Sequence, residues 1–258
     1  MRRLRLQALG LAALAAAGPL QAQGPAGWLQ ADGFYHHVTN DFGDWKGLGI
    51  QAHVPTGTTN VWFGELIAQE AFKDRGVYLS GANRHQFGSD WFTFVGVGGG
   101  TGDYYFPDLR VDAQVGRAWL GRKNLVTTVG AMYANSKSVY QDVALTGSVA
   151  VYLPGVTIEG GGRVNWSSPG QVTTGRGYGA VTAGRERKRF VTLRVAGGYE
   201  GYQLTGAVET EQKFSSYEAS LSWREWLGGH VGTFIQLDWY HNPYYTRNGI
   251  TAGVFRHW

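Results

Sequence analysis

Segments of about ten residues in which apolar and polar side chains alternate recur through almost the whole chain. In one of the clearest, 230–241, Ile235 and Leu237 fall on one side while Gln236 and Asp238 fall on the other. Successive side chains of a β-strand point to opposite faces, so this period predicts strands with one apolar and one polar face. Helical periodicity is almost absent. The chain is therefore expected to be all-β.

The alternating segments number fourteen, and they are separated by Gly, Asn, Asp, Pro or Ser, which favour turns. The third and tenth are the weakest, and dropping or merging a pair would give twelve strands. The expected strands are 27–37, 44–53, 59–72, 76–86, 91–98, 109–120, 125–136, 139–153, 156–166, 175–185, 190–200, 212–224, 230–241 and 249–258.

The connections between these segments differ in length with their position in the order. Those after even-numbered strands are short, as at 154–155 and 187–188. Several after odd-numbered strands are long, namely 99–108, 167–174, 201–211 and 242–248. Short turns at one end and longer loops at the other are typical of outer-membrane barrels, whose short turns are periplasmic. The pattern predicts a transmembrane antiparallel up-and-down β-barrel with both termini periplasmic.

A closed sheet follows if the apolar faces contact outer-membrane lipid. Every backbone amide and carbonyl at that depth then needs a partner within the chain, and only closure removes the unpaired edges. Strands of about ten residues span a bilayer at the usual tilt. The 40 glycines fit tight turns and close packing on the interior wall. One barrel domain is therefore expected over 23–258.

Aromatic residues gather near the ends of the expected strands. Amphipathic rings prefer the headgroup level of a bilayer, which produces two girdles around a membrane barrel. The alternative is that Trp and Tyr are simply favourable strand residues. The expected girdle residues are Trp28, Trp62, Trp91, Trp119, Tyr152, Trp166, Trp223, Trp239 and Trp258.

The last expected strand ends on an aromatic residue, Trp258. An amphipathic final strand with a terminal aromatic is the feature that the barrel assembly machinery reads. Gly253, Phe255 and Trp258 are the expected assembly signal, although Arg256 stands where an apolar or aromatic residue is usual. The assembly machinery is therefore an expected partner.

Residues 1–22 have the three parts of a cleaved signal peptide: a short basic start, an apolar run over 6–17 and a small residue near the cut. The run is too short for a membrane-spanning helix. Removal of its three arginines lowers the formal charge from +4 to +1. A near-neutral chain argues against nucleic-acid binding. The absence of Cys excludes disulfides and a thiol nucleophile.

The polar faces of the expected strands carry charges of both signs, which we expect to line the lumen. A mixed set either forms salt-bridge ladders that rigidify the wall and narrow the passage, or leaves a weakly selective polar conduit. A ring of one sign would instead predict ion selectivity. The expected lumen residues are Arg84, Arg110, Asp112, Gln114, Asp142, Glu159, Arg163, Arg194, Glu218, Arg224, Gln236 and Asp238.

Catalytic and metal-binding patterns are missing from the sequence. There is no G-x-S-x-G nucleophile elbow. His36 and His37 are strand neighbours that face opposite ways, so they cannot hold one metal together. The glycine run 96–102 lacks the G-x-G-x-x-G spacing and a following helix. No catalytic residue, metal or cofactor is expected, and His85 and His241 are the best candidates for the opposing view of a barrel-borne enzyme.

Aromatic turn motifs, among them 104–108 and 151–155, follow one another in order along the chain. Together they resemble the YaiO family of outer-membrane β-barrel proteins. The resemblance covers nearly the whole chain after the leader and implies a single barrel in a Gram-negative outer membrane. Related barrels accompany envelope polysaccharide export, which suggests a polysaccharide partner by association only, and the family supplies no catalytic residues. The motifs lie at 44–45, 104–108, 139–140, 151–155, 167–170, 224–228 and 240–244.

These features predict a passive polar channel, or a structural or surface component, in the cell outer membrane. One alternative is an enzyme acting on surface lipid or glycan, and another is a soluble secreted all-β binding module. The longer loops carry rings that either pack the loops onto the rim, stack on sugars or plug the mouth. These rings belong to Tyr104, Tyr105, Phe106, Tyr202, Tyr244 and Tyr245.

Overall fold

The computed structural model describes residues 27–103, 105–137, 139–204 and 210–258. Fourteen strands form a single antiparallel sheet, which confirms the predicted count over the alternative of twelve. Every strand boundary lies within four residues of its expected position. The strands are β1 (Trp28–Val38), β2 (Trp45–Thr56), β3 (Asn60–Ala71), β4 (Asp74–Phe87), β5 (Trp91–Gly100), β6 (Leu109–Trp119), β7 (Leu125–Asn135), β8 (Gln141–Leu153), β9 (Val156–Ser168), β10 (Val172–Arg185), β11 (Arg189–Leu204), β12 (Thr210–Trp226), β13 (Val231–His241) and β14 (Thr246–His257).

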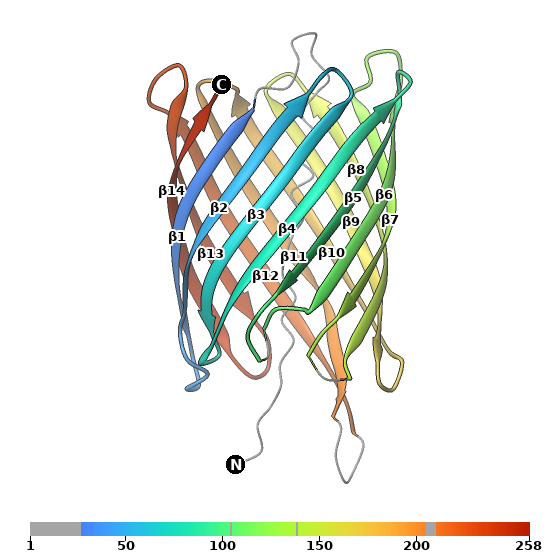
Figure 1. The fold of residues 1–258 in the computed structure, drawn as a ribbon, viewed down its shortest axis with the longest axis vertical. Helices are drawn as coiled ribbons and strands as arrows, with labels where there is room; N and C mark the ends of the chain where they lie inside the picture. The colour runs from blue at the N-terminus through green and yellow to red at the C-terminus, as the bar shows by residue number, and fades with distance from the viewer. Residues whose placement is uncertain (1–26, 104, 138, 205–209) are drawn as a thin grey trace.

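The sheet closes on itself as an up-and-down barrel. Each strand pairs with the next, and β14 pairs with β1 from Trp28 opposite His257 to Val38 opposite Arg247. The start of β1 and the end of β14 therefore lie side by side at the end of the barrel that is uppermost in Figure 1. We call this the turn end and the opposite one the loop end. Closure leaves no strand edge unpaired. The predicted leader, 1–22, lies outside the described residues.

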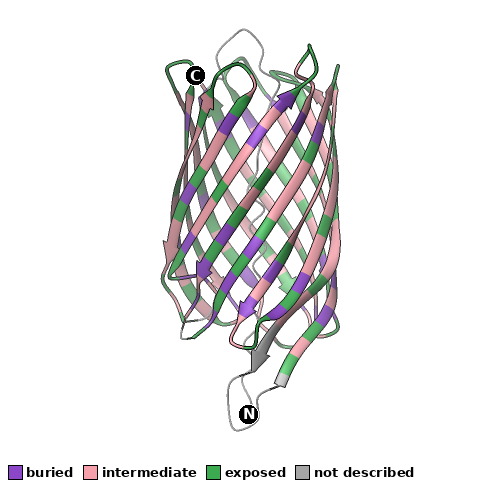
Figure 2. Cartoon of the chain, turned by 90° about the vertical axis from the view of Figure 1, so that its right-hand side faces the viewer, coloured by how far each residue is buried: buried purple, intermediate pink, exposed green. Residues whose placement is uncertain are grey.

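Alternation along each strand separates an outer and an inner face (Figure 2). On β13, Ile235 and Leu237 are about half exposed, whereas the alternate residues Gln236 and Asp238 are less exposed. Polar side chains of strands that are not neighbours meet on the inner face. Arg224 of β12 donates to Gln30 of β1. The polar face is therefore the concave one, as the closed topology requires.

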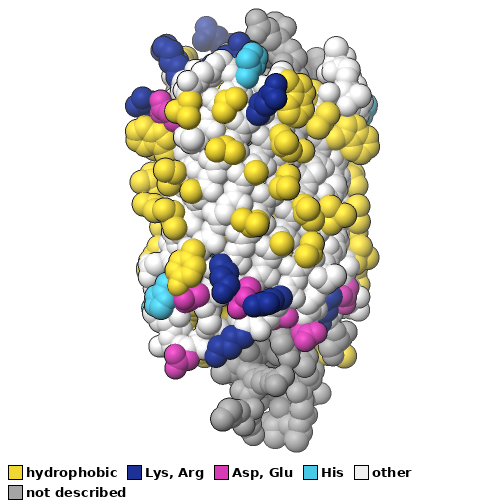
Figure 3. Space-filling model, turned by 60° about the vertical axis from the view of Figure 1, so that its left-hand side comes forward, with side chains coloured by type: hydrophobic (Ala, Val, Ile, Leu, Met, Phe, Trp, Pro, Cys, Tyr) yellow, Lys and Arg dark blue, Asp and Glu magenta, His cyan; other side chains and the backbone are white. Residues whose placement is uncertain are grey.

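The outer surface has the distribution of side chains expected for a membrane barrel. Hydrophobic side chains are spread over the middle of the barrel, and charged side chains gather towards its two ends (Figure 3). Exposed Val, Leu and Ile residues supply most of this surface. A contiguous apolar band of this kind fits contact with lipid, and water-soluble monomers rarely expose one. Within the described part of the chain, no helix is long and apolar enough to cross a membrane.

Some inner-face glycines leave the space that a neighbouring aromatic ring on the same face occupies. A methyl group on Gly116 would overlap the Phe92 ring, and one on Gly232 would overlap the Phe255 ring. Phe92 and Phe255 are both buried, so each ring lies against the wall. Such pairs allow a ring to occupy the inner face without extending across the lumen.

The loops are shorter than predicted because the strands continue further. The long connections expected at 167–174 and 242–248 shrink to 169–171 and 242–245. The connection between β3 and β4 is only Phe72 and Lys73, which both have positive φ, as a tight type I′ turn requires. The difference in length between the two ends is therefore weaker than the sequence indicated. The polar ends of these strands keep pairing beyond their apolar segments.

Candidate functional site: the barrel interior

The inner wall carries ionised and amide side chains along its whole length. The structure places every expected lumen residue at an inner-face position of its strand, by register with the neighbouring strands. This holds for Arg84, Arg110, Asp112, Gln114, Asp142, Glu159, Arg163, Arg194, Glu218, Arg224, Gln236 and Asp238.

Towards the loop end, opposite charges and amides form local ladders. Arg110 donates two hydrogen bonds to Asp112, from Nε at 2.7 Å and from Nη2 at 2.9 Å. Asp142 Oδ1 accepts from Asn165 Nδ2 at 2.8 Å and from Ser167 Oγ at 2.5 Å. Two-residue spacing places both partners of a pair on one face of a strand. The Arg110–Asp112 pair is a salt bridge of the kind that the mixed charge pattern allows, and Asp142 is held by neutral donors instead.

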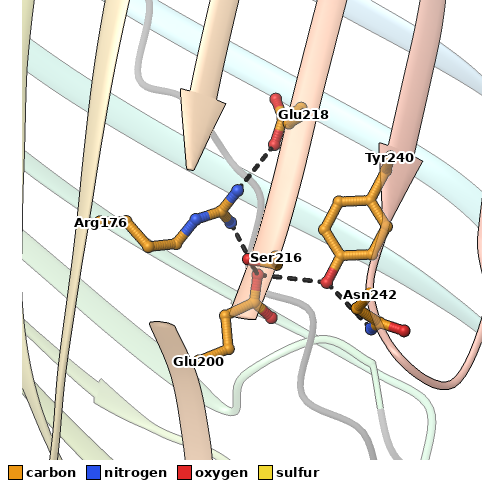
Figure 4. Close-up of polar contacts among 6 residues, drawn as sticks. All are labelled: Arg176, Glu200, Ser216, Glu218, Tyr240 and Asn242. Carbon is orange, nitrogen blue, oxygen red and sulfur yellow. Dashed lines mark hydrogen bonds and ion pairs between the residues drawn. The ribbon is translucent and has the colours of Figure 1, made fainter. Parts of the chain in front are cut away.

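The most connected of these polar groups lies around Glu200 on β11 (Figure 4). Arg176 of β10 contacts Glu200 at 2.8 Å and Glu218 of β12 at 3.4 Å. The side chains of Arg176 and Glu200 are each only 12% exposed, so the pair is sheltered from bulk water. Ser216 Oγ also donates to Glu200, at 2.7 Å. Charge-assisted contacts in such surroundings fix the geometry of the three strands.

The same group of residues reaches the β13–β14 loop. Tyr240 Oη donates to Glu200 at 3.2 Å and accepts from Asn242 Nδ2 at 3.1 Å. Asn242 Oδ1 then accepts from the backbone amides of Tyr244 and Tyr245, both at 2.9 Å. The polar wall of the barrel therefore determines where the two loop tyrosines lie.

Aromatic residues from four loops and from β2 meet at the loop end. We call the set Phe42, Trp45, Phe72, Tyr105 and Tyr245 the aromatic cap. Trp45 lies 4.9 Å from Phe72 and 5.1 Å from Tyr105, and Tyr245 lies 5.4 Å from Phe42, all between ring centroids. Trp45 and Tyr245 are each only 2% exposed. Edge-on and tilted contacts at these distances are favourable aromatic packing.

The cap rings pack against each other and against the inner wall. Burial raises the pKa of the loop phenols Tyr105 and Tyr245, which therefore stay protonated and neutral. Arg247 lies over the Trp45 ring at 4.1 Å. Of the other loop aromatics, Phe106 stacks on Tyr78, whereas Tyr104 and the Tyr202 side chain lie outside the described part.

Towards the turn end, inner-face arginines stack on rings. Arg84 lies over Phe92 at 4.2 Å, and Arg194 lies over Tyr178 at 3.9 Å. Arg224 lies over Phe255 at 4.4 Å. None of these three arginines forms an ion pair with any residue that the structure describes. Arg110 and Arg176 towards the loop end thus have carboxylate partners, whereas Arg84, Arg194 and Arg224 towards the turn end lie over rings.

The predicted girdle residues divide between the two faces. Trp62, Trp91, Trp119 and Trp223 are exposed on the outer face near the turn end, and Trp258 is exposed beside them. The outward positions near the loop end belong to Trp166 and Trp239.

The girdle prediction is wrong for Trp28 and Tyr152. Trp28 stacks on His53 with a centroid distance of 5.8 Å, and Tyr152 packs with Phe92 on the inner wall. Trp45, at the start of β2, also faces inward as part of the cap. A ring near a strand end has no apolar neighbour beyond it to fix its face, so alternation alone does not decide its direction.

The expected assembly-signal residues do not share a face. Phe255 and Gly253 face inward, where Phe255 packs on Trp226 with a centroid distance of 5.0 Å. Trp258 is 57% exposed. Phe255 therefore belongs to the inner wall, and Trp258 is the outward aromatic of this terminus.

Sequence reasoning missed several inner polar residues, above all Arg176, Glu200 and Asn242. Arg176 lies between Gly175 and Gly177, so no apolar alternation marked it. Glu200 lay at the edge of an expected strand that in fact continues to Leu204. Counting every second residue from the known inner-face positions towards the strand ends would have predicted that Arg176 and Glu200 face the lumen.

The described residues contain no group of three or more His, Asp or Glu side chains placed to hold a metal ion. His85 Nδ1 contacts Asn60 at 3.0 Å, and His241 Nδ1 contacts Thr246 at 2.9 Å. His36 faces inward beside Asp238, whereas His37 is exposed near Asp44. The two neighbouring histidines therefore point apart, as the alternation predicts.

Comparison with known proteins agrees with the fold. The model of the YaiO membrane beta barrel domain matches residues 29–203. The chain belongs to this family. The YaiO match spans β1 to most of β11, so the resemblance seen in the earlier motifs is confirmed, whereas the motifs at 224–228 and 240–244 lie beyond the matched residues. No curated protein matches the sequence.

Solved outer-membrane barrels share the architecture of this YaiO-family chain at very low identity. The CymD monoaromatic hydrocarbon channel has a TM-score of 0.61 at 5% identity, covering 91% of this chain and 88% of that one. Omp33 of Acinetobacter baumannii has a TM-score of 0.56 at 9% identity, covering 91% and 100%. A bacterial polysaccharide outer membrane secretin has a TM-score of 0.55 at 8% identity, covering 89% and 97%. The chain is an outer-membrane β-barrel, which excludes the soluble secreted module.

Proposed function

We propose that this barrel is a passive channel for small polar solutes across the outer membrane. The observation that carries the proposal is the inner wall, which bears ionised side chains from Arg224 near the turn end to Asp142 near the loop end. The Phe92 and Phe255 rings on that wall are buried against Gly116 and Gly232. A hydrated lumen solvates these charges, whereas a dry one would leave them at a high desolvation cost.

The aromatic cap is the proposed constriction of this channel. Trp45 and Tyr245 are buried at the loop end, and the other three cap rings are partly buried against them. Asn242 joins the loop that bears Tyr245 to the wall through Tyr240 and Glu200. A cap anchored through several hydrogen bonds has a defined position and limits the size of solutes. Charges of both signs on the wall favour weak ion selectivity.

Conductance in planar bilayers tests the channel. The wild type should give small, ohmic steps, and the double variant Tyr105→Ala, Tyr245→Ala should give steps at least twice as large. Tyr199→Ala, which removes an outward ring that is 55% exposed, is the matched control and should behave as the wild type. Absence of steps from both the wild type and the double variant would refute the channel.

Sugar polymers are the proposed larger solutes, by association with the family and by analogy with the polysaccharide secretin of the same fold. Addition of neutral or acidic oligosaccharides should reduce the conductance of the cap variant more than that of the wild type. Equal conductance with and without oligosaccharide would confine the channel to small solutes.

We further propose that the barrel is not an enzyme. His85 and His241 each contact a neutral side chain, Asn60 or Thr246, and not a carboxylate that would orient them for catalysis. The double variant His85→Ala, His241→Ala should leave the lipid and glycan profiles of the outer membrane unchanged. An altered profile in that variant would favour the enzyme instead.

For assembly, we propose periplasmic termini and recognition of the last strand by the barrel assembly machinery. Removal of Trp258, the outward terminal ring, should reduce the amount of folded barrel in outer membranes several-fold. Trp62→Ala is the control because Trp62 is an exposed ring at the same barrel end on β3. Equal amounts of both folded variants would argue against a role for Trp258.

A further inference from the structure

Four rings form a continuous arc on the inner wall near the turn end. Trp28 of β1 stacks on His53 of β2 with a centroid distance of 5.8 Å and an interplanar angle of 6°. His53 meets Phe63 of β3 at 5.1 Å, and Phe63 meets Phe94 of β5 at 5.8 Å. All four rings are only partly buried, unlike Phe92 and Phe255 on the same wall. We call Trp28, His53, Phe63 and Phe94 the lumen arc.

A guanidinium stands at each end of the lumen arc. Arg224 lies over Trp28 at 5.2 Å, and Arg84 pairs in register with Phe94 on the neighbouring strand. The hydrogen bonds of these arginines go to neutral amides: Arg224 donates to Gln30 Oε1, and Arg84 donates to Gln86 Oε1 at 3.5 Å. Buried Arg84 Nε has no hydrogen-bond partner among the described residues.

Arg110 and Arg176, which lie nearer the loop end, differ from these two arginines in the chemistry of their partners. Arg110 and Arg176 have carboxylate partners at 2.7 and 2.8 Å. Arg84 and Arg224 have none among the described residues, although both are partly buried and each lies against a ring. A sheltered cation without a counter-charge is costly, so an anion in the lumen would be bound favourably there. Guanidinium is well suited to a carboxylate because it can donate two parallel hydrogen bonds.

We propose that the lumen arc with Arg84 and Arg224 binds an organic anion that carries a carboxylate on a ring with an apolar face. The rings contact the apolar face, and either guanidinium takes the carboxylate. Aromatic carboxylates and sugar acids share this chemistry. The inference rests on the proposed channel only for the route by which the anion enters.

Binding to the full chain in detergent micelles, measured by isothermal titration calorimetry, tests the site without any need for conductance. Benzoate and galacturonate are the probes, with benzyl alcohol and galactose as their neutral counterparts. At least one anion should bind at least tenfold more tightly than its neutral counterpart. Binding of benzoate alone identifies an aromatic carboxylate, binding of galacturonate alone identifies a sugar acid, and binding of both identifies the shared group.

Variants locate the site. Arg224→Gln and Arg84→Gln should each weaken anion binding at least tenfold. Arg117→Gln removes an outward arginine that lies over Trp119 near the same end, and it should bind as the wild type does. Folding is checked by heat-modifiable gel migration. If one lumen variant fails to fold, the other carries the test, and if both fail, the comparison of anion with neutral probe in the wild type decides.

Three results would overturn the site: equal binding of anion and neutral probe, no binding of either anion, or unchanged binding in the folded lumen variants. Anion binding without any conductance would refute the proposed channel and leave the site intact. Conductance without anion binding would refute the site alone.

Discussion

At the scale of single residues, glycine and aromatic side chains together shape the inner wall. Gly116 on β6 faces inward, and the Phe92 ring of β5 covers it so closely that no Cβ fits between them. The φ of Gly116 is not in the left-handed region, so backbone conformation does not require glycine there. The space occupied by the Phe92 ring does. The Phe92 ring therefore packs directly against the backbone of β6.

Gly116→Ala should therefore lower the free energy of unfolding by about 1–3 kcal/mol, the usual cost of overpacking. Unfolding in urea from lipid vesicles measures the change. Gly64→Ala is the control because nothing lies within 4 Å of a Cβ at that outward glycine. A larger loss at Gly64 than at Gly116 would contradict the packing described here.

Neighbouring residues on β13 should respond very differently to a charge. Ile235 is 49% exposed on the outer face near the middle of the strand, and Gln236 faces the lumen. Ile235→Arg should cost about 2–4 kcal/mol near the bilayer midplane. Gln236→Arg should cost far less, because water and other charges surround that position. Equal costs in the same vesicle unfolding measurement would show that the faces are misassigned.

How far the sequence predicts a residue's face depends on its neighbours. Ile235 and Gln236 sit in a long alternation, and both faces were predictable. Trp28, Tyr152 and Phe255 sit near strand ends, where no continued pattern outweighs a ring's tolerance for either face. Their inward directions follow from partners on other strands, such as His53 for Trp28, which no local pattern reveals.

At the scale of elements, the β1–β2 hairpin is held by one carboxylate. Asp44 accepts hydrogen bonds from Tyr35 Oη, from the Val38 amide at 3.1 Å and from His37 Nδ1 at 2.9 Å. These donors, Tyr35 first, hold the pKa of Asp44 below its usual 3.8. The carboxylate thus anchors the loop next to Trp45 of the aromatic cap.

The contribution of Asp44 should depend on pH in a definite direction. Because its pKa is lower in the folded state, the stabilisation is fully present above 3.8 and is lost as the pH falls through the lower folded value. Asp44→Asn should thus lower the urea midpoint more at pH 6 than at pH 2.5. An equal effect at both pH values would mean that charge at Asp44 does not matter.

Elements were predictable from the sequence to within a few residues, but their connections were less so. Strands such as β11 and β14 continue past the apolar segment, where polar residues keep the backbone pairing without an apolar face to reveal it. For the same reason the network around Glu200 escaped prediction. It joins β10, β11 and β12 with a loop, which only the closed register brings together.

At the scale of the whole molecule, closure depends on strands at opposite ends of the chain. The family match ends at residue 203, yet β14 completes the ring by pairing with β1. The outer face is apolar and suits lipid, and the inner face is polar and suits water. The alternation of apolar and polar residues along each strand produces both faces. The channel, the cap and the anion site all presuppose this separation of the two solvents.

The most direct test of that separation is a cysteine scan along β13, from 233 to 238. The chain has no native Cys, so each variant carries one thiol. In proteoliposomes, a small water-soluble maleimide should label Phe234→Cys, Gln236→Cys and Asp238→Cys quickly. Thr233→Cys, Ile235→Cys and Leu237→Cys should react slowly with it and should instead be quenched by lipid-borne probes when labelled with a fluorophore. Equal labelling at all six positions, or the opposite alternation, would contradict a lipid-enclosed barrel with a wet lumen.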